Sequence, residues 1–168
     1  MIDYTTEQLH SIAILSIFTI LFFYKMIAII RRFRSKSLLA RNRTLKKLKR
    51  LSWEDFELLT MELFEREGWS VKGNEKKGAD GGVDIWMQKK SWHKKNIRAI
   101  VQCKRYEDAI VTIKVIREMY GLMHEYEVDE VYIVTTSRFT KECYVFSSKK
   151  HIMLIDGVKL LKLIHKIK

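Results

Sequence analysis

The chain has 168 residues, of which 47% are hydrophobic and 31% charged, and its formal net charge is +12. This length suffices for one globular domain with a short appendage. Two cysteines, and five histidines without the spacing of metal ligands, exclude a disulfide framework and a zinc site. Residues 1–50 hold 11 of the 32 Lys and Arg residues and only two acids, so we expect most of the basic excess outside the folded domain.

Residues 11–30 are apolar except for Lys25 and a few hydroxyl side chains. Twenty helical residues span about 30 Å, the thickness of a hydrocarbon core. Their Ile, Leu and Phe side chains favour insertion by roughly 4–7 kcal/mol, which outweighs one lysine costing about 3 kcal/mol. The segment therefore predicts a transmembrane helix. A buried helix of a soluble domain is the alternative; a cleaved signal peptide would need a basic start and a small-residue cleavage site.

Residues 31–50 carry ten Lys and Arg residues and no acid. The positive-inside rule then predicts a single-pass protein of the cell inner membrane, with residues 1–10 as a short extracytoplasmic tail and the rest cytoplasmic. We interpret 31–50 as a basic juxtamembrane segment that contacts the anionic leaflet; binding of a DNA backbone by the same segment is the alternative, but the membrane interpretation suffices. Part of it is predicted to be an interfacial helix by a thin apolar stripe of leucines: Leu38, Leu45, Leu48 and Leu51.

Residues 51–168 are predicted to form one domain that alternates helices and strands. Ser52 is expected to cap a first helix that Gly68 ends. The later helices are expected at Thr112–Tyr126, Lys141–Lys149 and Val158–Ile167, and the strands at Trp69–Val71, Val83–Gln88, Ile97–Lys104, Glu130–Thr135 and Ile152–Ile155. This order predicts an α/β fold with a central mixed β-sheet flanked by helices.

The second and third predicted strands carry the candidate chemistry. Side chains alternate along a strand, so Gln102 and Lys104 share one face and Cys103 points to the other. A hairpin would bring Asp84 beside them. Mg²⁺ prefers oxygen ligands, which Asp84, Gln102 and the backbone carbonyl of Cys103 can supply, while Lys104 can act on an attacking water. The spacing alone is also compatible with a surface hairpin.

These residues resemble the PD-(D/E)XK nuclease site in its Mrr-like restriction endonuclease branch, where glutamine takes the place of the usual glutamate. The resemblance covers residues 51–168 and rests on these segments in family order: Phe56-Glu57, Gly68-Trp69, Gly78–Asp84, Val101–Tyr106, Thr135–Thr140 and Leu154–Gly157. It implies a restriction-endonuclease-like core that cleaves DNA with Mg²⁺, or Mn²⁺ as a substitute, in the manner of a type IV restriction enzyme. It further implies that Glu57 joins the site as a catalytic acid and metal ligand, and that the enzyme acts as a homodimer.

Several residues are weaker candidates for contacts with DNA. Basic side chains in the turn between the second and third strands could bind the phosphate backbone, as could polar side chains after the fourth strand. They are Lys89, Lys90, Lys94, Lys95, Ser137 and Arg138. A solvated turn and a solvated loop explain them equally well.

The expected function is that of a membrane-anchored, divalent-metal-dependent DNA endonuclease that restricts foreign DNA. Two alternatives stay open. One is a membrane-tethered DNA-binding module with weak or no cleavage, because Gln102 is a weaker metal ligand than a carboxylate. The other is a structure-selective nuclease that resolves DNA junctions, because the fold alone does not decide the substrate.

Overall fold

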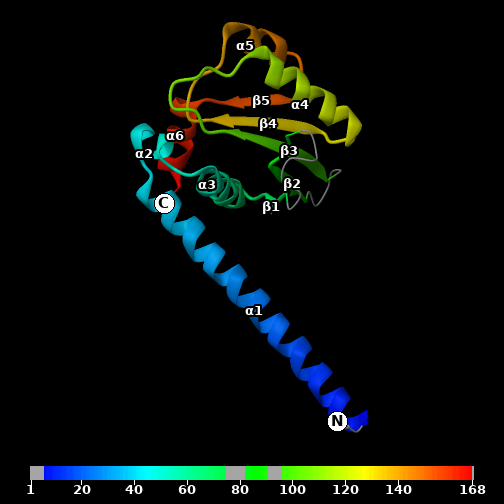
Figure 1. Ribbon diagram of the computed structural model, residues 1–168. Helices are drawn as coiled ribbons and strands as arrows, with labels where there is room; N and C mark the ends of the chain where they lie inside the picture. The colour runs from blue at the N-terminus through cyan, green and yellow to red at the C-terminus, as the bar shows by residue number, and fades with distance from the viewer. Residues whose placement is uncertain (1–5, 75–81, 91–95, 168) are drawn as a thin grey trace. The chain divides into compact units, whose positions relative to one another are not determined.

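The computed structural model describes residues 6–74, 82–90 and 96–167 and divides into two compact units, residues 1–34 and residues 35–168. The chain runs through six helices and five strands in the described ranges. Their bounds, marked in Figure 1, are α1 Thr6–Arg41, α2 Leu45–Lys49, α3 Trp53–Arg66, β1 Ser70–Gly73, β2 Ile85–Lys89, β3 Ile97–Lys104, α4 Ile113–Glu125, β4 Glu130–Thr135, α5 Lys141–Ser147, β5 Ile152–Ile155 and α6 Gly157–Lys166.

The five strands form one mixed sheet in the order β1-β2-β3-β4-β5. β1, β2 and β3 pair antiparallel, whereas β3, β4 and β5 pair parallel. The predicted hairpin is confirmed, with Ile85 opposite Val101 and Lys89 opposite Ile97. Because β2 begins where β3 ends, Asp84 and the residues around Lys104 lie at the same edge of the sheet.

Helices cover both faces of the sheet, and each face has its own apolar cluster (Figure 1). The first cluster packs α3 and α6 against inward side chains of β3 such as Val101 and Cys103. The second packs α4 and α5 against Ile100 and Ile133. β4 is buried on both faces, as its nearly continuous apolar run predicts. The α/β architecture expected from the sequence is confirmed.

The first compact unit, residues 1–34, is occupied mainly by α1, whose apolar side chains from Leu9 to Phe33 are exposed on all sides of the helix. A helix that is apolar all round is typical of a membrane span. By length and composition it is the one described helix that could cross a bilayer, with a mean hydropathy of 2.3 in its most apolar window, a test that signal sequences and core helices of soluble proteins also pass.

The second compact unit begins at Ser35, sixteen residues before the domain start predicted from the sequence. Leu39 and Leu48 are buried in the first apolar cluster, and Leu38 and Leu51 pack against it. The prediction of an interfacial helix along this leucine stripe is therefore wrong, because the stripe faces the protein core. The hydroxyl of Ser35 also donates to Glu62 on α3, 3.0 Å away, and Arg66 donates to the same buried carboxylate at 2.8 Å.

This boundary changes where the charge lies. The unit from residue 35 to residue 168 holds 28 of the 32 Lys and Arg residues and 18 of the 20 acids, so its net charge is +10. The expectation that most of the basic excess lies outside the folded domain is wrong. Cations that read as a linker in the sequence are part of the domain surface, because the leucines between them are core residues.

Candidate active site

Asp84 is held at the start of β2 by its backbone. Its N–H donates to the carbonyl of Val101 on β3, and its carbonyl accepts from the N–H of Asn74, both at 2.9 Å. The side-chain amide of Asn74 donates to the carbonyl of Val83 at the same distance. Asn74 follows β1, so both neighbouring strands fix the backbone that carries the carboxylate. Sequence reasoning missed this residue, since a lone Asn in a polar loop gives no distinguishing signal.

The carboxylate of Asp84 points at β3. Its Oδ2 accepts from the backbone N–H of Cys103 at 2.6 Å and from Nε2 of Gln102 at 3.3 Å. Burial raises the pKa of Asp84 above its ordinary value, although these two hydrogen bonds and the charge of Lys104 act in the opposite direction. A desolvated carboxylate of this kind gains most from a cation that can pair with it.

Gln102 is buried, with 4% of its surface exposed, and its amide lies against Gly82. A Cβ at position 82 would come within 2.8 Å of Gln102 Oε1, closer than side chains approach one another. Gly82 also has φ of +102°, a conformation that favours glycine. Glycine is thus required at position 82 both for its backbone conformation and for the room it leaves the side chain of Gln102.

The backbone of Cys103 faces the site while its thiol faces the core. Its N–H donates to Asp84, and a residue in a β-ladder points its N–H and C=O toward the same neighbour, so its carbonyl is also directed to the β2 side. Burial and the charges of Asp84 and Glu57 raise the pKa of the thiol, while a hydrogen bond with Thr60 lowers it. Glu57 on α3 therefore lies close enough to Cys103 for its charge to act on the thiol.

Lys104 ends β3, half-buried and close enough to Asp84 for their charges to interact. Its carbonyl accepts from the hydroxyl of Thr135 at 2.7 Å, and the hydroxyl of Thr136 donates to Tyr106 at 2.7 Å. Both threonines are fully buried. They fix the backbone at Lys104 and two residues after it, a role that their place at the end of an apolar run did not reveal.

Lys89 and Lys90 lie at the other end of β2 from Asp84. Lys89 pairs with Ile97 and lies five residues along β2 from Asp84, or about 16 Å. Its ammonium donates to the carbonyl of Glu67 and lies 5.4 Å from the ring centroid of Trp69. Lys90 follows it and is exposed; Lys94 and Lys95 lie outside the described residues. The structure thus places Lys89 and Lys90 away from Asp84, because the turn of a hairpin lies opposite its open end.

Ser137 and Arg138, by contrast, follow β4 at the same sheet edge as the site. Ser137 is half-buried: its N–H donates to the hydroxyl of Thr135, and its carbonyl accepts from Gly157. The side chain of Arg138 is exposed. The structure brings together Asp84, Gln102, the backbone of Cys103 and Lys104, with Glu57 nearby on α3.

Residues 48–164 match the Mrr catalytic-domain family, described as "Restriction endonuclease". The chain belongs to this family. The Mrr match begins at Leu48, which is buried in the core, and not at Leu51. It contains every described member of the site. No curated protein matches the chain.

Two solved restriction endonucleases are similar to the Mrr domain in structure. The DNA modification-dependent restriction endonuclease AspBHI superimposes with a TM-score of 0.56 at 14% identity, over 79% of this chain and 35% of that one. MspJI, solved in complex with a 27-mer oligonucleotide, gives 0.48 at 20% identity, over 64% and 26%. The chain thus spans about a third and a quarter of their lengths, and at these identities the likeness concerns the fold.

The donor set at the sheet edge fits a hard divalent cation. It offers the carboxylate of Asp84, the amide of Gln102 and the backbone carbonyl of Cys103, all oxygen donors of the kind that Mg²⁺ prefers. Among the described residues no three His, Cys, Asp or Glu side chains gather as metal ligands, and the only thiol near the site points into the core. The residues present therefore suit Mg²⁺ or Mn²⁺ better than zinc.

Proposed function

We propose that this protein is a membrane-anchored, divalent-metal-dependent DNA endonuclease that restricts foreign DNA. The observation that carries the proposal is the contact between the desolvated carboxylate of Asp84 and the end of β3, with Lys104 alongside, in a chain of the Mrr family. The structural similarity to AspBHI, a restriction endonuclease, supports the proposal, because this fold carries DNA cleavage in that protein.

Each residue then has a part in phosphodiester hydrolysis. Asp84, Gln102 and the Cys103 carbonyl hold the metal, with Glu57 assisting from α3. The bound metal supplies charge neutralisation and an acidified water. Lys104 would orient the attacking water and, as an ammonium, stabilise negative charge on the phosphate; taking up the proton of the water would require its neutral amine form. Gln102 Nε2 donates to Asp84, so the amide would have to rotate for its oxygen to serve as a metal ligand.

The proposed membrane anchor is residues 11–30 of α1. Arg31, Arg32 and Arg34, with no acid among them, would lie at the anionic cytoplasmic leaflet. This orientation places the site in the cytoplasm of a cell with an inner membrane, and leaves residues 1–10 outside. Carbonate extraction of the full chain, together with protease protection of each end, tests the anchor and its orientation. Release by carbonate would rule the anchor out.

Gln102 supports one second candidate. An amide that donates to the catalytic carboxylate binds metal more weakly than a second carboxylate would, so a tethered DNA-binding module with little cleavage is the alternative. The deciding experiment incubates the detergent-solubilised full chain with supercoiled plasmid in Mg²⁺, Mn²⁺ or EDTA. Metal-dependent nicking supports the endonuclease; salt-dependent DNA binding without cleavage in either metal supports the module.

The products of the same assay test the remaining proposals. A homodimer that cuts both strands gives linear plasmid, whereas independent monomers give open circles. Preference for a four-way junction over a linear duplex of equal length would place the enzyme among junction-resolving nucleases and not in restriction.

A further inference from the structure

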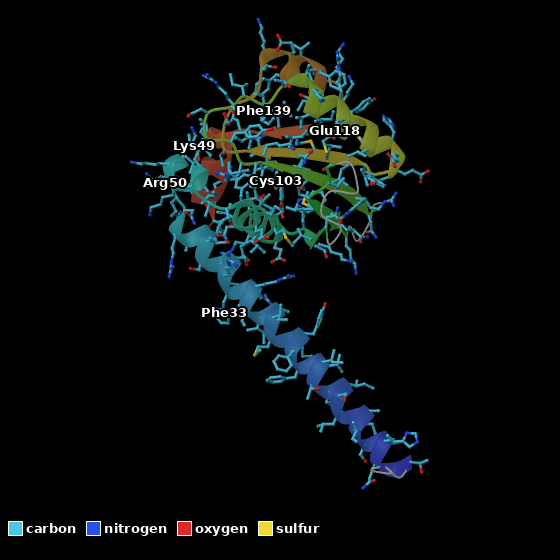
Figure 2. The ribbon with its side chains drawn as sticks, in the orientation of Figure 1. Phe33, Lys49, Arg50, Cys103, Glu118 and Phe139 are labelled. Carbon is cyan, nitrogen blue, oxygen red and sulfur yellow. The ribbon has the colours of Figure 1, made fainter. Side chains whose placement is uncertain are left out.

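The short helix α2 and its flanks are the most basic part of the domain surface. Between residues 41 and 50 there is no acid, and six side chains are cationic: Arg41, Arg43, Lys46, Lys47, Lys49 and Arg50. All but Lys49, which is partly covered, are exposed. We call these six residues the α2 basic surface. Figure 2 labels Lys49, the last residue of α2, and Arg50, which follows it, at the margin of the domain.

Three contacts fix this surface over the carboxyl ends of the parallel strands. Arg105, directly after Lys104, donates to the carbonyl of Lys49 at 2.8 Å. The side chain of Leu45 packs so closely on Gly157 that a Cβ there would lie 2.7 Å from it and 2.7 Å from the carbonyl of Thr136. His165 on α6 lies 3.0 Å from the carbonyl of Arg43. Figure 1 shows α2 beyond the ends of β4 and β5, next to α6.

The α2 basic surface therefore lies at the same edge of the sheet as the candidate site. Arg105 connects the two, because it directly follows Lys104 in the chain and its guanidinium donates to the carbonyl of Lys49 on α2. Its guanidinium also lies 5.3 Å from the ring centroid of Trp53, which is 43% exposed at the start of α3. The hydrogen bond from Arg105 fixes the end of α2 beside the strand end that carries Lys104.

The chemistry of the surface favours a polyanion over a bilayer. The leucines of this segment are buried or packed on the core, so α2 offers no apolar face to insert between lipids. What remains exposed is a row of cations, which suits evenly spaced phosphates. Lys49 meets Asp108 at 3.2 Å, but the ammonium of Lys46 and the guanidinium of Arg50 project from the exposed side of the segment.

We infer that the α2 basic surface binds the phosphate backbone of duplex DNA next to the scissile bond and sets the position of the duplex over the site. The inference rests on the proposed nuclease function for its biological use, but the binding it describes needs no metal. It assigns to α2 a role that the sequence analysis had considered both for residues 31–50 and for lysines such as Lys89, which lies at the far end of β2 from Asp84.

The test measures binding of a labelled 30-base-pair duplex by the full chain in phosphatidylcholine nanodiscs, in EDTA and over a range of salt. Lys46→Gln with Arg50→Gln is compared with Lys114→Gln and Lys149→Gln, which remove the same charge from exposed positions on α4 and after α5. We expect the α2 pair to weaken binding about 10- to 100-fold near 0.1 M salt and to reduce the slope of log affinity against log salt by about two.

The α4/α5 pair should change the slope by less than about half a unit. Equal losses in both pairs, or an unchanged α2 pair, would overturn the inference. So would an α2 pair that binds DNA normally and loses only its response to phosphatidylglycerol in the nanodisc, since the partner would then be lipid. If the wild-type protein binds DNA in EDTA but never cleaves it with metal, the proposed nuclease function is refuted, whereas DNA binding by the α2 basic surface is not.

Discussion

The side-chain amide of Gln102 donates to Oδ2 of Asp84 across 3.3 Å, and this pair ties the start of β2 to the end of β3. The contact places a hydrogen-bond donor where a metal ligand is needed. It compensates part of the cost of burying Asp84 while no cation is present. If Asp84 and Gln102 hold a metal as proposed, the stability of the protein and its affinity for that metal would be linked through this hydrogen bond.

Asp84→Asn should stabilise the metal-free protein at neutral pH. The pKa of Asp84 is raised above 3.8 by burial, so the protonated carboxyl favours the fold below pH 3.8, and this contribution is lost as pH rises through the folded-state pKa. At pH 7 the ionised carboxylate opposes folding, and an amide does not. Thermal unfolding in EDTA should give Asp84→Asn the higher midpoint at pH 7, with the advantage shrinking toward pH 4.

Added metal should reverse that order. Mg²⁺ binds only the folded state and should raise the unfolding midpoint of the parent but not that of Asp84→Asn. An equal response of both proteins to Mg²⁺ would show that the cation binds elsewhere.

Gln102→Glu should exchange stability for metal affinity. Two carboxylates at this separation repel one another, so the metal-free protein should lose about 1–2 kcal/mol at pH 7, the equivalent of a pKa shift of about one unit. The extra carboxylate should tighten Mg²⁺ binding about tenfold or more, measured by titration calorimetry. Gln102→Met, of similar size and without oxygen, is the matched control and should bind Mg²⁺ more weakly than the parent. Unchanged affinity in both variants would remove Gln102 from the metal site.

Gly82→Ala should disturb the site through Gln102. The residue has φ of +102°, and its new Cβ would come within 2.8 Å of Gln102 Oε1, so we expect a loss of about 1–3 kcal/mol in the free energy of unfolding. Gly121→Ala is the control: it lies inside α4 with nothing within 4 Å of the added Cβ and should gain about 0.5–1 kcal/mol. Chemical denaturation of both variants measures the difference. A Gly82→Ala protein as stable as the parent would contradict the close packing described here.

Sequence reasoning predicted most of the sheet, and it predicted that Asp84 would lie beside Gln102 and Lys104, for physical reasons. β4 and β5 were predicted to the residue, because buried parallel strands are short apolar runs with polar ends. The alternation of Gln102, Cys103 and Lys104 followed from strand geometry alone. Asn74, Thr135 and Thr136 were not assigned roles, because their hydrogen bonds join segments that are distant in sequence.

The N-terminal boundary of the domain was mistaken for an equally physical reason. Leu39 and Leu48 are core residues set among cations, and a stripe of leucines in a basic helix reads the same whether it faces a membrane or a protein. Whether Lys89 and Lys90 contact DNA stays a prediction, but the register of β2 and β3 places Lys89 about 16 Å along the strand from Asp84.

The boundary gives a prediction of its own. Leu48→Ala should destabilise the protein by about 2–5 kcal/mol, because the side chain is fully buried in the first apolar cluster. Val145→Ala on α5, where the side chain is 69% exposed, should change stability by less than about 0.5 kcal/mol. By the same reasoning a fragment of residues 51–168 should unfold at a lower denaturant concentration than residues 35–168. Equal midpoints for the two fragments would show that residues 35–50 do not contribute to the stability of the domain.

Cleavage by Lys104 variants tests the central claim most directly. The full chain, solubilised in detergent, is incubated with supercoiled plasmid and Mg²⁺ at several concentrations, and the initial nicking rate is measured beside metal-free duplex binding. We predict that the parent nicks only with metal, and that Lys104→Ala is slowed about 100-fold or more while still binding the duplex. Cleavage that persists in EDTA, or a Lys104→Ala protein that cuts as fast as the parent, would contradict the account.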